Sequence, residues 1–338
     1  MKFSRSKKII FVNNKGGVGK TTLAFNCAVS FAKQGYKTVI IDLDPQCNIT
    51  RLSMGEEFYV KTLFSATEKT IYDVLKGVTE GGSDIDLTAK FLPVKAANNL
   101  YLLKGDINLS AYEALLINAY GQAASGQKIG YFSTSAIDRF LREKGLNEEI
   151  DIFVIDTSPS LGLLNQIILL GADYFIVPMM PDAFSLQGIE NLGTVYEKWK
   201  TNWKVTAKAL AGNTETKFVL PGDPLFIGYI INSYNVYGKQ PIVDHRVWME
   251  KIPNSVKKYL SEKHCRNGLV ESSWKNPLQI IQDYGRIPAK CQEIGSAIFD
   301  LDPNLIDKKQ LGTKENIEKS KQEFKNLSDK ILKTLSEY

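Results

Sequence analysis

The sequence predicts an α/β fold in which a doubly wound, mostly parallel sheet carries helices on both faces. Two observations favour this class: the expected strands are continuous apolar runs, and segments with helical periodicity separate them. A third observation is the glycine-rich turn that joins the first expected strand to the first expected helix. At 338 residues the chain is long enough for one large domain with insertions.

The first three elements are expected to form a βαβ unit. Residues 7–14 (KKIIFVNN) are a short β-branched strand that ends in the glycine-rich turn. Residues 21–35 carry apolar side chains at helical spacing and stop at Gly35, a typical signal for the end of a helix. Residues 37–44 (KTVIIDLD) form a second buried strand, and a right-handed crossover between two parallel strands is expected.

The later part of the chain continues this alternation. Continuous apolar runs predict three more strands, at 151–158, 173–180 and 225–234, with a helix at 160–171. The final segment, 313–338, has apolar residues near one face of an amphipathic helix, namely Ile317, Phe324, Leu327, Ile331 and Leu335.

The region 55–150 is less regular than the rest. Helical periodicity appears three times in it, at 70–77, 108–124 and 132–145; a strand is expected at 100–105 and a loop at 79–90. Nothing in the chain has the composition of a flexible linker. We therefore expect a single domain over residues 1–338, with an insertion at about 55–150 and a C-terminal helical tail at about 305–338.

The composition excludes several classes of protein. With 43% hydrophobic and 23% charged residues, the chain has the balance of a globular protein with a packed core. Its 4 cysteines form no C-x-x-C pair, which argues against a zinc ribbon and an iron–sulfur carrier and fits reduced thiols. No apolar run approaches the roughly 18 residues that span a bilayer. A cytoplasmic protein is expected.

The stretch NNKGGVGKTT, residues 13–22, has the composition of a phosphate-binding loop. Between a strand and a helix, such a turn directs backbone N–H groups and the helix dipole toward an anion, and its glycines allow the backbone to approach closely. Lys20 is placed to neutralise the β- and γ-phosphates of a nucleotide, and the Thr21 hydroxyl to bind Mg²⁺. The loop also holds a second lysine, Lys15, which the general pattern does not require.

The segment KGGVGKTT resembles the deviant Walker A motif of the ParA/MinD family of P-loop ATPases, and within it the ParA-like partition ATPases. In that family the first lysine, matched here by Lys15, reaches across a nucleotide-sandwich dimer to the ATP of the partner subunit. The resemblance implies hydrolysis of ATP to ADP and phosphate that depends on Mg²⁺ and is slow until an ATP-bound homodimer forms.

Two further segments carry the resemblance. IDLDPQCN, residues 41–48, resembles the second motif of the family, in which the aspartate matched by Asp44 aligns the attacking water near the metal. FVIDTSPSLG, residues 153–162, resembles the Walker B and switch region. There Asp156 would support the hydration shell of Mg²⁺, and Thr157–Pro159 would respond to the γ-phosphate. Asp42 points the same way as Asp44 along its strand, and is either a partner of that site or a structural anchor.

The resemblance also implies contacts to the nucleotide base. Asn232 matches the base-contacting asparagine of the family, with an ordinary turn residue as the alternative, and residues 286–301 resemble the segment that flanks the base. The predicted catalytic residues are Lys15, Lys20, Asp44 and Asp156, and the predicted Mg²⁺ site is formed by Thr21, Asp44 and Asp156. The predicted contacts to ATP or ADP are Lys15, Gly16, Gly17, Val18, Gly19, Lys20, Thr21, Thr22, Asn232 and Pro288.

Positive charge concentrates in segment 196–266, which has 12 basic and 6 acidic residues. Such an excess predicts non-specific binding to the phosphate backbone of double-stranded DNA, although a solvated surface is the simpler interpretation for any single lysine. The predicted DNA contacts are Lys198, Lys200, Lys204, Lys239, Arg246, Lys251, Lys257 and Lys258.

Together these features predict a dimerising ATPase of ParA type that acts in plasmid or chromosome partition or in cargo positioning. It would associate with the nucleoid when ATP-bound, and a ParB-like activator or a cargo adaptor would trigger its hydrolysis. Two alternatives are an accessory ATPase of a mobile-element or defence assembly and a MinD-like positioning ATPase on a membrane. The latter needs a basic amphipathic C-terminal helix, whereas this tail mixes both signs of charge and is expected to pack on the domain. No membrane contact is expected.

Overall fold

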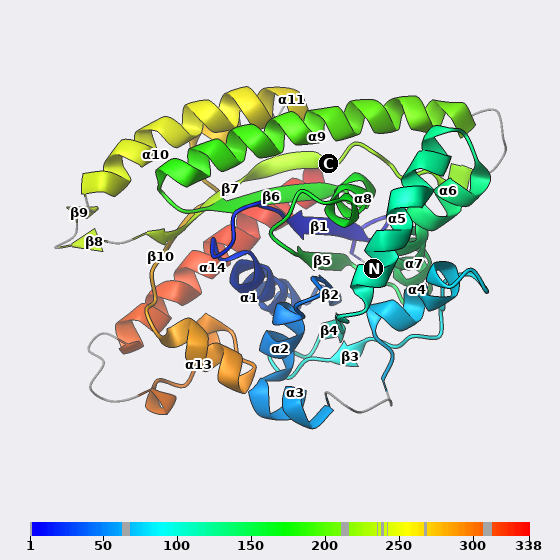
Figure 1. The fold of residues 1–338 in the computed structure, drawn as a ribbon. Helices are drawn as coiled ribbons and strands as arrows, with labels where there is room; N and C mark the ends of the chain where they lie inside the picture. The colour runs from blue at the N-terminus through cyan, green and yellow to red at the C-terminus, as the bar shows by residue number, and fades with distance from the viewer. Residues whose placement is uncertain are drawn as a thin grey trace.

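A computed structural model describes residues 2–62, 68–210, 216–234, 236–237, 240–241, 243–266, 269–306 and 313–338. Within these residues, eight strands form one sheet in the order β10-β7-β6-β1-β5-β2-β4-β3 (Figure 1). Every neighbouring pair is parallel except β3 with β4. The strands are β1 (Lys7–Phe11), β2 (Thr38–Leu43), β3 (Leu92–Pro93), β4 (Leu100–Leu103), β5 (Ile152–Thr157), β6 (Tyr174–Met179), β7 (Leu225–Tyr234) and β10 (Gln279–Gln282); β8 (Val236–Tyr237) and β9 (Gln240–Pro241) form a separate ribbon.

Strand β1 lies at the point where the strand order reverses. It pairs with β5 on one side and with β6 on the other. The chain crosses from β1 to β2 in one direction and from β5 to β6 in the opposite direction, which is the doubly wound arrangement. All residues of β1, β2, β5 and β6 are buried, because helices cover both faces of the sheet. The predicted fold class is therefore confirmed.

One face of the sheet is covered by the helices α1 (Lys20–Lys33), α2 (Asn48–Met54), α13 (Ile287–Ile294) and α14 (Thr313–Glu337) (Figure 1). The five apolar residues predicted to line one side of the C-terminal helix are all buried there. The Ser30 and Ser328 hydroxyls, 2.8 Å apart, also join α1 to α14. The tail helix thus packs on the domain, as its sequence predicts.

The opposite face carries a second core and the longest helix, α9 (Ala183–Leu210). Large aromatic side chains such as Tyr196 and Trp203 point from α9 into this core, where the Trp203 indole N–H donates to the carbonyl of Leu220 at 3.1 Å. Helix α10 (Val243–Val256) lies beside α9 and continues through a π-helical turn (Lys257–Ser261) into α11 (Glu262–His264) (Figure 1). The remaining helices of this face are α4 (Ile71–Thr79), α5 (Leu109–Ala124), α6 (Lys128–Thr134), α7 (Ala136–Asn147), α8 (Leu163–Gly171) and α12 (Val270–Lys275).

The region 55–150 contributes to the sheet as well as to its cover. Strand β4 is the predicted strand at 100–105 and pairs in parallel with β2, while α4, α5 and α7 match the three predicted helices. Helix α4 begins at a capping box, in which Thr70 N donates to Asp73 at 2.8 Å and the Thr70 hydroxyl accepts from Asp73 N. The sequence did not predict helix α3 (Glu56–Thr62), and helix α6 begins before the predicted helix at 132–145. Because these elements share the cores of the main sheet, we propose that residues 1–338 form one domain. Among the helices described, none combines the length and apolarity needed to cross a bilayer.

Candidate functional site

The glycine-rich loop runs from the end of β1 to the first turn of α1. Gly17 and Gly19 have positive φ angles of 75° and 85°, which side-chain-bearing residues rarely adopt. Gly19 is the N-cap of α1 and provides no side-chain cap, so the first N–H groups of the helix are open to an external acceptor. A Cβ on Gly16 or Gly17 would meet nothing within 4 Å, because both residues border a cavity. The loop therefore has the backbone geometry of an anion site.

Replacing Gly19 with alanine is expected to lower the free energy of unfolding by about 1–3 kcal/mol. The added Cβ would need φ near +85° and would overlap the side-chain amide of Asn232. Urea unfolding of Gly19→Ala measures the loss. Gly16→Ala is the matched control, because its Cβ would enter open space. Equal stability of Gly19→Ala and the unmodified protein would contradict the prediction.

Lys20 lines the cavity and is the first residue of α1. It is 6% exposed, and its ammonium donates to the carbonyl of Lys15 at 3.3 Å, on the far side of the loop. Burial lowers the pKa of Lys20, while the nearby carboxylates of Asp156 and Asp44 act in the opposite direction. An anion bound in the loop would complete the neutralisation of this buried ammonium.

Thr21 and Asp156 meet at the carboxyl end of β5. The Thr21 hydroxyl donates to Asp156 Oδ2 at 2.8 Å, whereas Asp156 Oδ1 is buried without a hydrogen-bond partner among the described residues. Burial raises the pKa of Asp156 to about 8, and the neighbouring carboxylate of Asp42 adds to the shift. An orphaned carboxylate oxygen beside a hydroxyl is a donor set that suits a hard cation such as Mg²⁺.

Asp44 follows β2, the strand next to β5, and faces the same cavity. It is 4% exposed, and its Oδ1 accepts from the backbone N–H of Gln46 at 2.9 Å. Its own N–H donates to Asp42 Oδ1 at 3.1 Å. Because parallel strands end at one edge of the sheet, two carboxylates that are 112 residues apart in sequence, Asp44 and Asp156, reach the same site.

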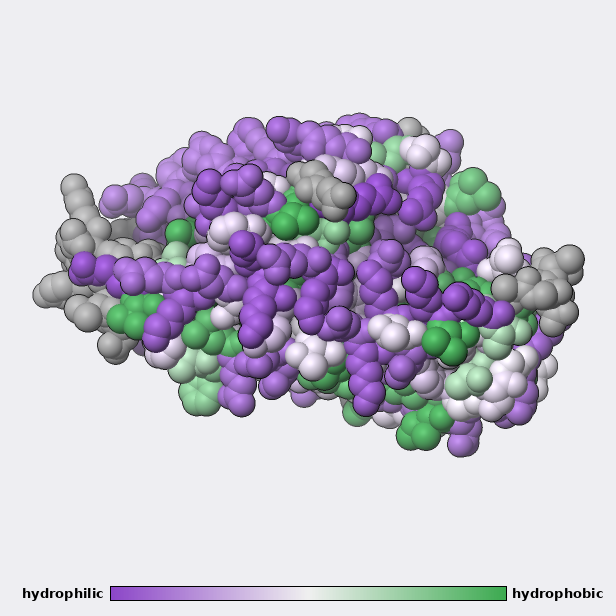
Figure 2. All heavy atoms as spheres, turned by 90° about the horizontal axis from the view of Figure 1, so that it is seen from above, coloured by the Kyte–Doolittle hydropathy of each residue, from purple (hydrophilic) through white to green (hydrophobic). Residues whose placement is uncertain are grey.

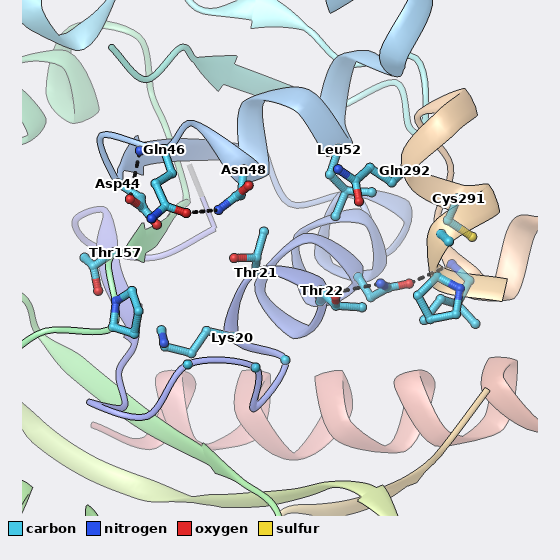
Figure 3. A pocket seen from close by; sticks show the side chains of 18 of the residues that line it. Lys20, Thr21, Thr22, Asp44, Gln46, Asn48, Leu52, Thr157, Cys291 and Gln292 are labelled. Carbon is cyan, nitrogen blue, oxygen red and sulfur yellow. Dashed lines mark hydrogen bonds between the residues drawn. The ribbon is translucent and has the colours of Figure 1, made fainter. Parts of the chain in front are cut away.

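The cavity that Lys20, Thr21 and Asp44 border has a volume of about 630 Å³. Asp156 does not line it directly and is connected to it through its hydrogen bond with Thr21. Figure 3 shows Lys20, Thr21 and Thr22 on one side of it, Asp44 and Gln46 on another, and the α13 residues Cys291 and Gln292 at its far end. Thr157, Pro159 and Pro288 also line it. The response of the switch segment to the γ-phosphate and the contact of Pro288 with the nucleotide stay predictions. The sequence interpretation did not assign several polar or apolar lining residues, namely Asn26, Gln46, Asn48, Leu52 and Gln292. Gln46 and Asn48 could have been inferred from their place inside the motif at 41–48.

Lys15 lies at the edge of the loop and turns away from the cavity. Its ammonium forms an ion pair with Asp182 and lies 5.5 Å from the ring centroid of Phe184, both just before or within the first turn of α9. Its backbone N–H donates to Asn13 Oδ1 at 2.9 Å. A role of Lys15 at the nucleotide of a partner subunit stays a prediction.

Asn232 lies in β7 against the back of the loop. Its side-chain amide donates to the carbonyl of Val18 at 3.0 Å and packs on Gly19. In this arrangement Asn232 supports the loop through Val18, and it is not one of the described residues that line the cavity. A contact between Asn232 and a nucleotide base stays a prediction.

The predicted DNA contacts follow α9, α10 and the turn after α10. Figure 2 views this side of the molecule and shows a mainly hydrophilic surface. Lys198, Lys204, Arg246, Lys251 and Lys258 are exposed. Two others are ion-paired: Lys200 with Asp223, and Lys257 with Glu262 at 3.8 Å. Lys239 lies outside the described residues.

Comparison with known proteins gives a consistent result. The AAA domain family AAA_31 matches residues 6–208, which include the loop, Asp44, Asp156 and nearly all of α9. An uncharacterised protein of Methanocaldococcus jannaschii is 31% identical over 234 residues, covering 69% of this chain and 75% of that protein. The chromosome-partitioning ATPase Soj of Treponema pallidum is 33% identical over 183 residues, covering 54% of this chain and 60% of Soj. McdA of Cyanothece, solved in complex with ATP, has the same fold, with a TM-score of 0.62 at 15% identity over 97% of each chain.

Proposed function

The chain belongs to the AAA_31 family and to the ParA/MinD-type P-loop ATPases, and from this premise we propose that it is a dimerising partition-type ATPase. It hydrolyses ATP to ADP and phosphate, and it binds double-stranded DNA without sequence preference in its ATP-bound, homodimeric state. The observation that carries the proposal is the cavity in which Lys20, Thr21 and Asp44 surround the open N-terminus of α1. Plasmid or chromosome partition, or cargo positioning, is the process that such a switch would serve.

The chain provides distinct groups for each part of the nucleotide. The open N–H groups of the loop and the Lys20 ammonium hold the β- and γ-phosphates. Thr22 borders the same cavity closer to α13, and Pro288 lines the end where the base would lie. Hydrogen bonds to Asp42 on β2 and to Gln46 in the following turn hold Asp44 at the end of β2, where its carboxylate can orient a water molecule.

The Thr21 hydroxyl, Asp156 and Asp44 are the residues that would hold Mg²⁺. Asp156 Oδ1 has no hydrogen-bond donor among the residues that the structure describes. This supports the assignment, because a buried carboxylate oxygen without a donor is costly unless a cation or its water shell reaches it. When bound, Mg²⁺ supplies neutralisation of the charge on the β- and γ-phosphates.

Two further features support a switch that depends on a partner. The Lys15 side chain lies outside the cavity of its own subunit and is 26% exposed, so it is accessible to a second subunit. Helices α9 and α10, which carry exposed lysines and an arginine, lie side by side, and binding to a phosphate backbone needs basic groups gathered in this way (Figure 1). A ParB-like activator or a cargo adaptor would trigger hydrolysis, and the protein would be cytoplasmic and associated with the nucleoid when ATP-bound.

Binding to random-sequence duplex DNA tests the proposal. We expect binding with ATP, and little with ADP or without nucleotide, that weakens steeply between about 50 and 200 mM salt. The Asp44→Ala variant serves to prevent turnover during the titration. Absence of DNA binding at low salt by a demonstrated ATP dimer would contradict the DNA part of the proposal while leaving the ATPase intact.

Charge reversal locates the DNA surface. The double variant Lys198→Glu/Lys204→Glu is expected to reduce the salt slope of DNA binding by about two, because each phosphate contact contributes about 0.9 to the slope. Lys321→Glu/Lys325→Glu on α14 is the matched control, since these lysines are exposed on a helix that covers the other face of the sheet. Equal loss of DNA binding in both double variants would mean that net charge, not this surface, determines affinity.

A further inference from the structure

Asp42 is a fully buried carboxylate on β2 that the proposed chemistry does not use directly. It makes no ion pair within the described part of the chain, yet both of its oxygens accept hydrogen bonds. Oδ1 accepts from Asp44 N at 3.1 Å, and Oδ2 accepts from Thr50 N at 3.1 Å and from the Thr50 hydroxyl at 2.6 Å. Three donors converge on one carboxylate, which is the kind of network that holds a buried charge in a single position.

These bonds join the two ends of the turn that carries Asp44. The turn runs from Asp44 to Cys47, which has a positive φ of 54° and is the N-cap of α2. Cys47 makes no side-chain cap, so the N–H of Thr50, the third residue of α2, has no local acceptor. Asp42 supplies that acceptor from β2, the strand that leads into the turn.

A second layer holds the Asp42 carboxylate in place. The Thr50 hydroxyl, while it donates to Asp42, accepts from the backbone N–H of Gly105 at 2.9 Å. Gly105 follows β4, the next strand of the sheet. A Cβ at Gly105 would lie 2.7 Å from the Asp42 carboxylate and 2.9 Å from the Cys47 sulfur. Only glycine therefore fits at position 105 without displacing Asp42 or the turn.

We infer that Asp42 is a positioning residue that holds the Asp44 turn in the geometry needed for hydrolysis. Thr50 and Gly105 in turn hold the Asp42 carboxylate in place. The inference rests on the proposed role of Asp44 in orienting water. It places the control of hydrolysis in a hydrogen-bonded chain that runs from the end of β4 through α2 to the end of β2. ATP binding depends on other residues, the loop and Lys20, and should not require this chain of bonds.

Thr50→Val tests the inference, because valine keeps the shape of threonine and removes the hydroxyl that links Gly105 to Asp42. We expect kcat for ATP hydrolysis to fall by about tenfold or more, with the Kd of a fluorescent ATP analogue changed by less than about twofold. Thr50→Ser, which restores the hydroxyl, should keep kcat within about threefold of the unmodified protein. Thr134→Val in α6 is the matched control, since Thr134 is also fully buried and hydrogen-bonded but lies away from the site.

Asp42→Asn and Asp44→Ala complete the set. Asp42→Asn should lower kcat without lowering ATP affinity, because an amide cannot accept from all three donors at once. Normal kcat in both Thr50→Val and Asp42→Asn would overturn the inference, as would an equal loss of kcat and ATP binding, which is the result of a merely structural role. Retained hydrolysis in Asp44→Ala would instead overturn the proposed role of Asp44. Loss of hydrolysis in Asp44→Ala with normal kcat in Thr50→Val would overturn the inference alone.

Discussion

Lys20→Ala is expected to abolish ATP hydrolysis and to weaken ATP binding, with a loss in kcat of at least about 10²–10³-fold. The reason is the position of the ammonium. Lys20 is 6% exposed beneath the glycine-rich loop, so it meets the phosphates in a place where solvent screens little of the interaction. In the described structure the only hydrogen bond of the Lys20 ammonium is to the carbonyl of Lys15, so its other N–H groups are available to a nucleotide.

The measurement is ATP hydrolysis under saturating ATP together with a direct titration of nucleotide binding. Lys76→Ala is a suitable control, because Lys76 is an exposed lysine of α4 that pairs with Glu80 at 4.0 Å, away from the cavity. ATP-dependent DNA binding should also be lost in Lys20→Ala. Hydrolysis at the unmodified rate in Lys20→Ala would contradict the assignment of the loop as the phosphate site.

Asp44→Ala is expected to keep ATP binding and to lower kcat by at least about 10²-fold, trapping the ATP-bound dimer. Asp44 borders the cavity but lies after β2, on the side opposite the phosphate loop, so its removal leaves the loop and Lys20 in place. Alanine removes the bond that the Asp44 carboxylate accepts from Gln46 N–H, but it retains the backbone N–H that ties the turn to Asp42. The loss should therefore fall on hydrolysis and not on affinity.

Size-exclusion chromatography with light scattering, with and without ATP, measures the trapped dimer, and single-turnover hydrolysis measures the chemical step. Asp86→Ala is the control, since Asp86 forms its ion pair with Lys69 at a surface remote from the cavity. Unchanged hydrolysis in Asp44→Ala would remove Asp44 from the mechanism. A monomer with bound ATP would contradict the dimer part of the proposal.

Long apolar strands and the glycine-rich loop were predictable from the sequence because each follows from local pattern. β7 was predicted at the residues where it is found, 225–234, and β1, β2, β5 and β6 within a few residues, since a run buried on both faces must be apolar throughout. The short strands β3 and β10 were not predicted. Each has four residues or fewer, and pairing with a neighbouring strand, not intrinsic propensity, stabilises them.

The same division applies to the site. Sequence motifs predicted the site residues Lys20, Thr21, Asp44 and Asp156. The structure brings them to one edge of the sheet. The sequence left Asp42 open between a partner of the site and an anchor, because strand periodicity gives only the direction of its side chain. The three donors that meet its carboxylate come from the turn and from α2, which only the folded chain brings together.

By itself, then, the sequence determined the fold class and the phosphate loop, because apolar periodicity and glycine spacing act within a few neighbouring residues. The roles of Asp44 and Asp156 were predicted from the resemblance of their segments to family motifs. Tertiary structure alone decided the ion pair of Lys15 with Asp182, the hydrogen bond of Asn232 to Val18, and the contact of Gly105 with Asp42. The partners in these contacts are between 63 and 214 residues apart in sequence. Their meeting depends on strand order and on which loops end at the same edge of the sheet, and no local pattern encodes either.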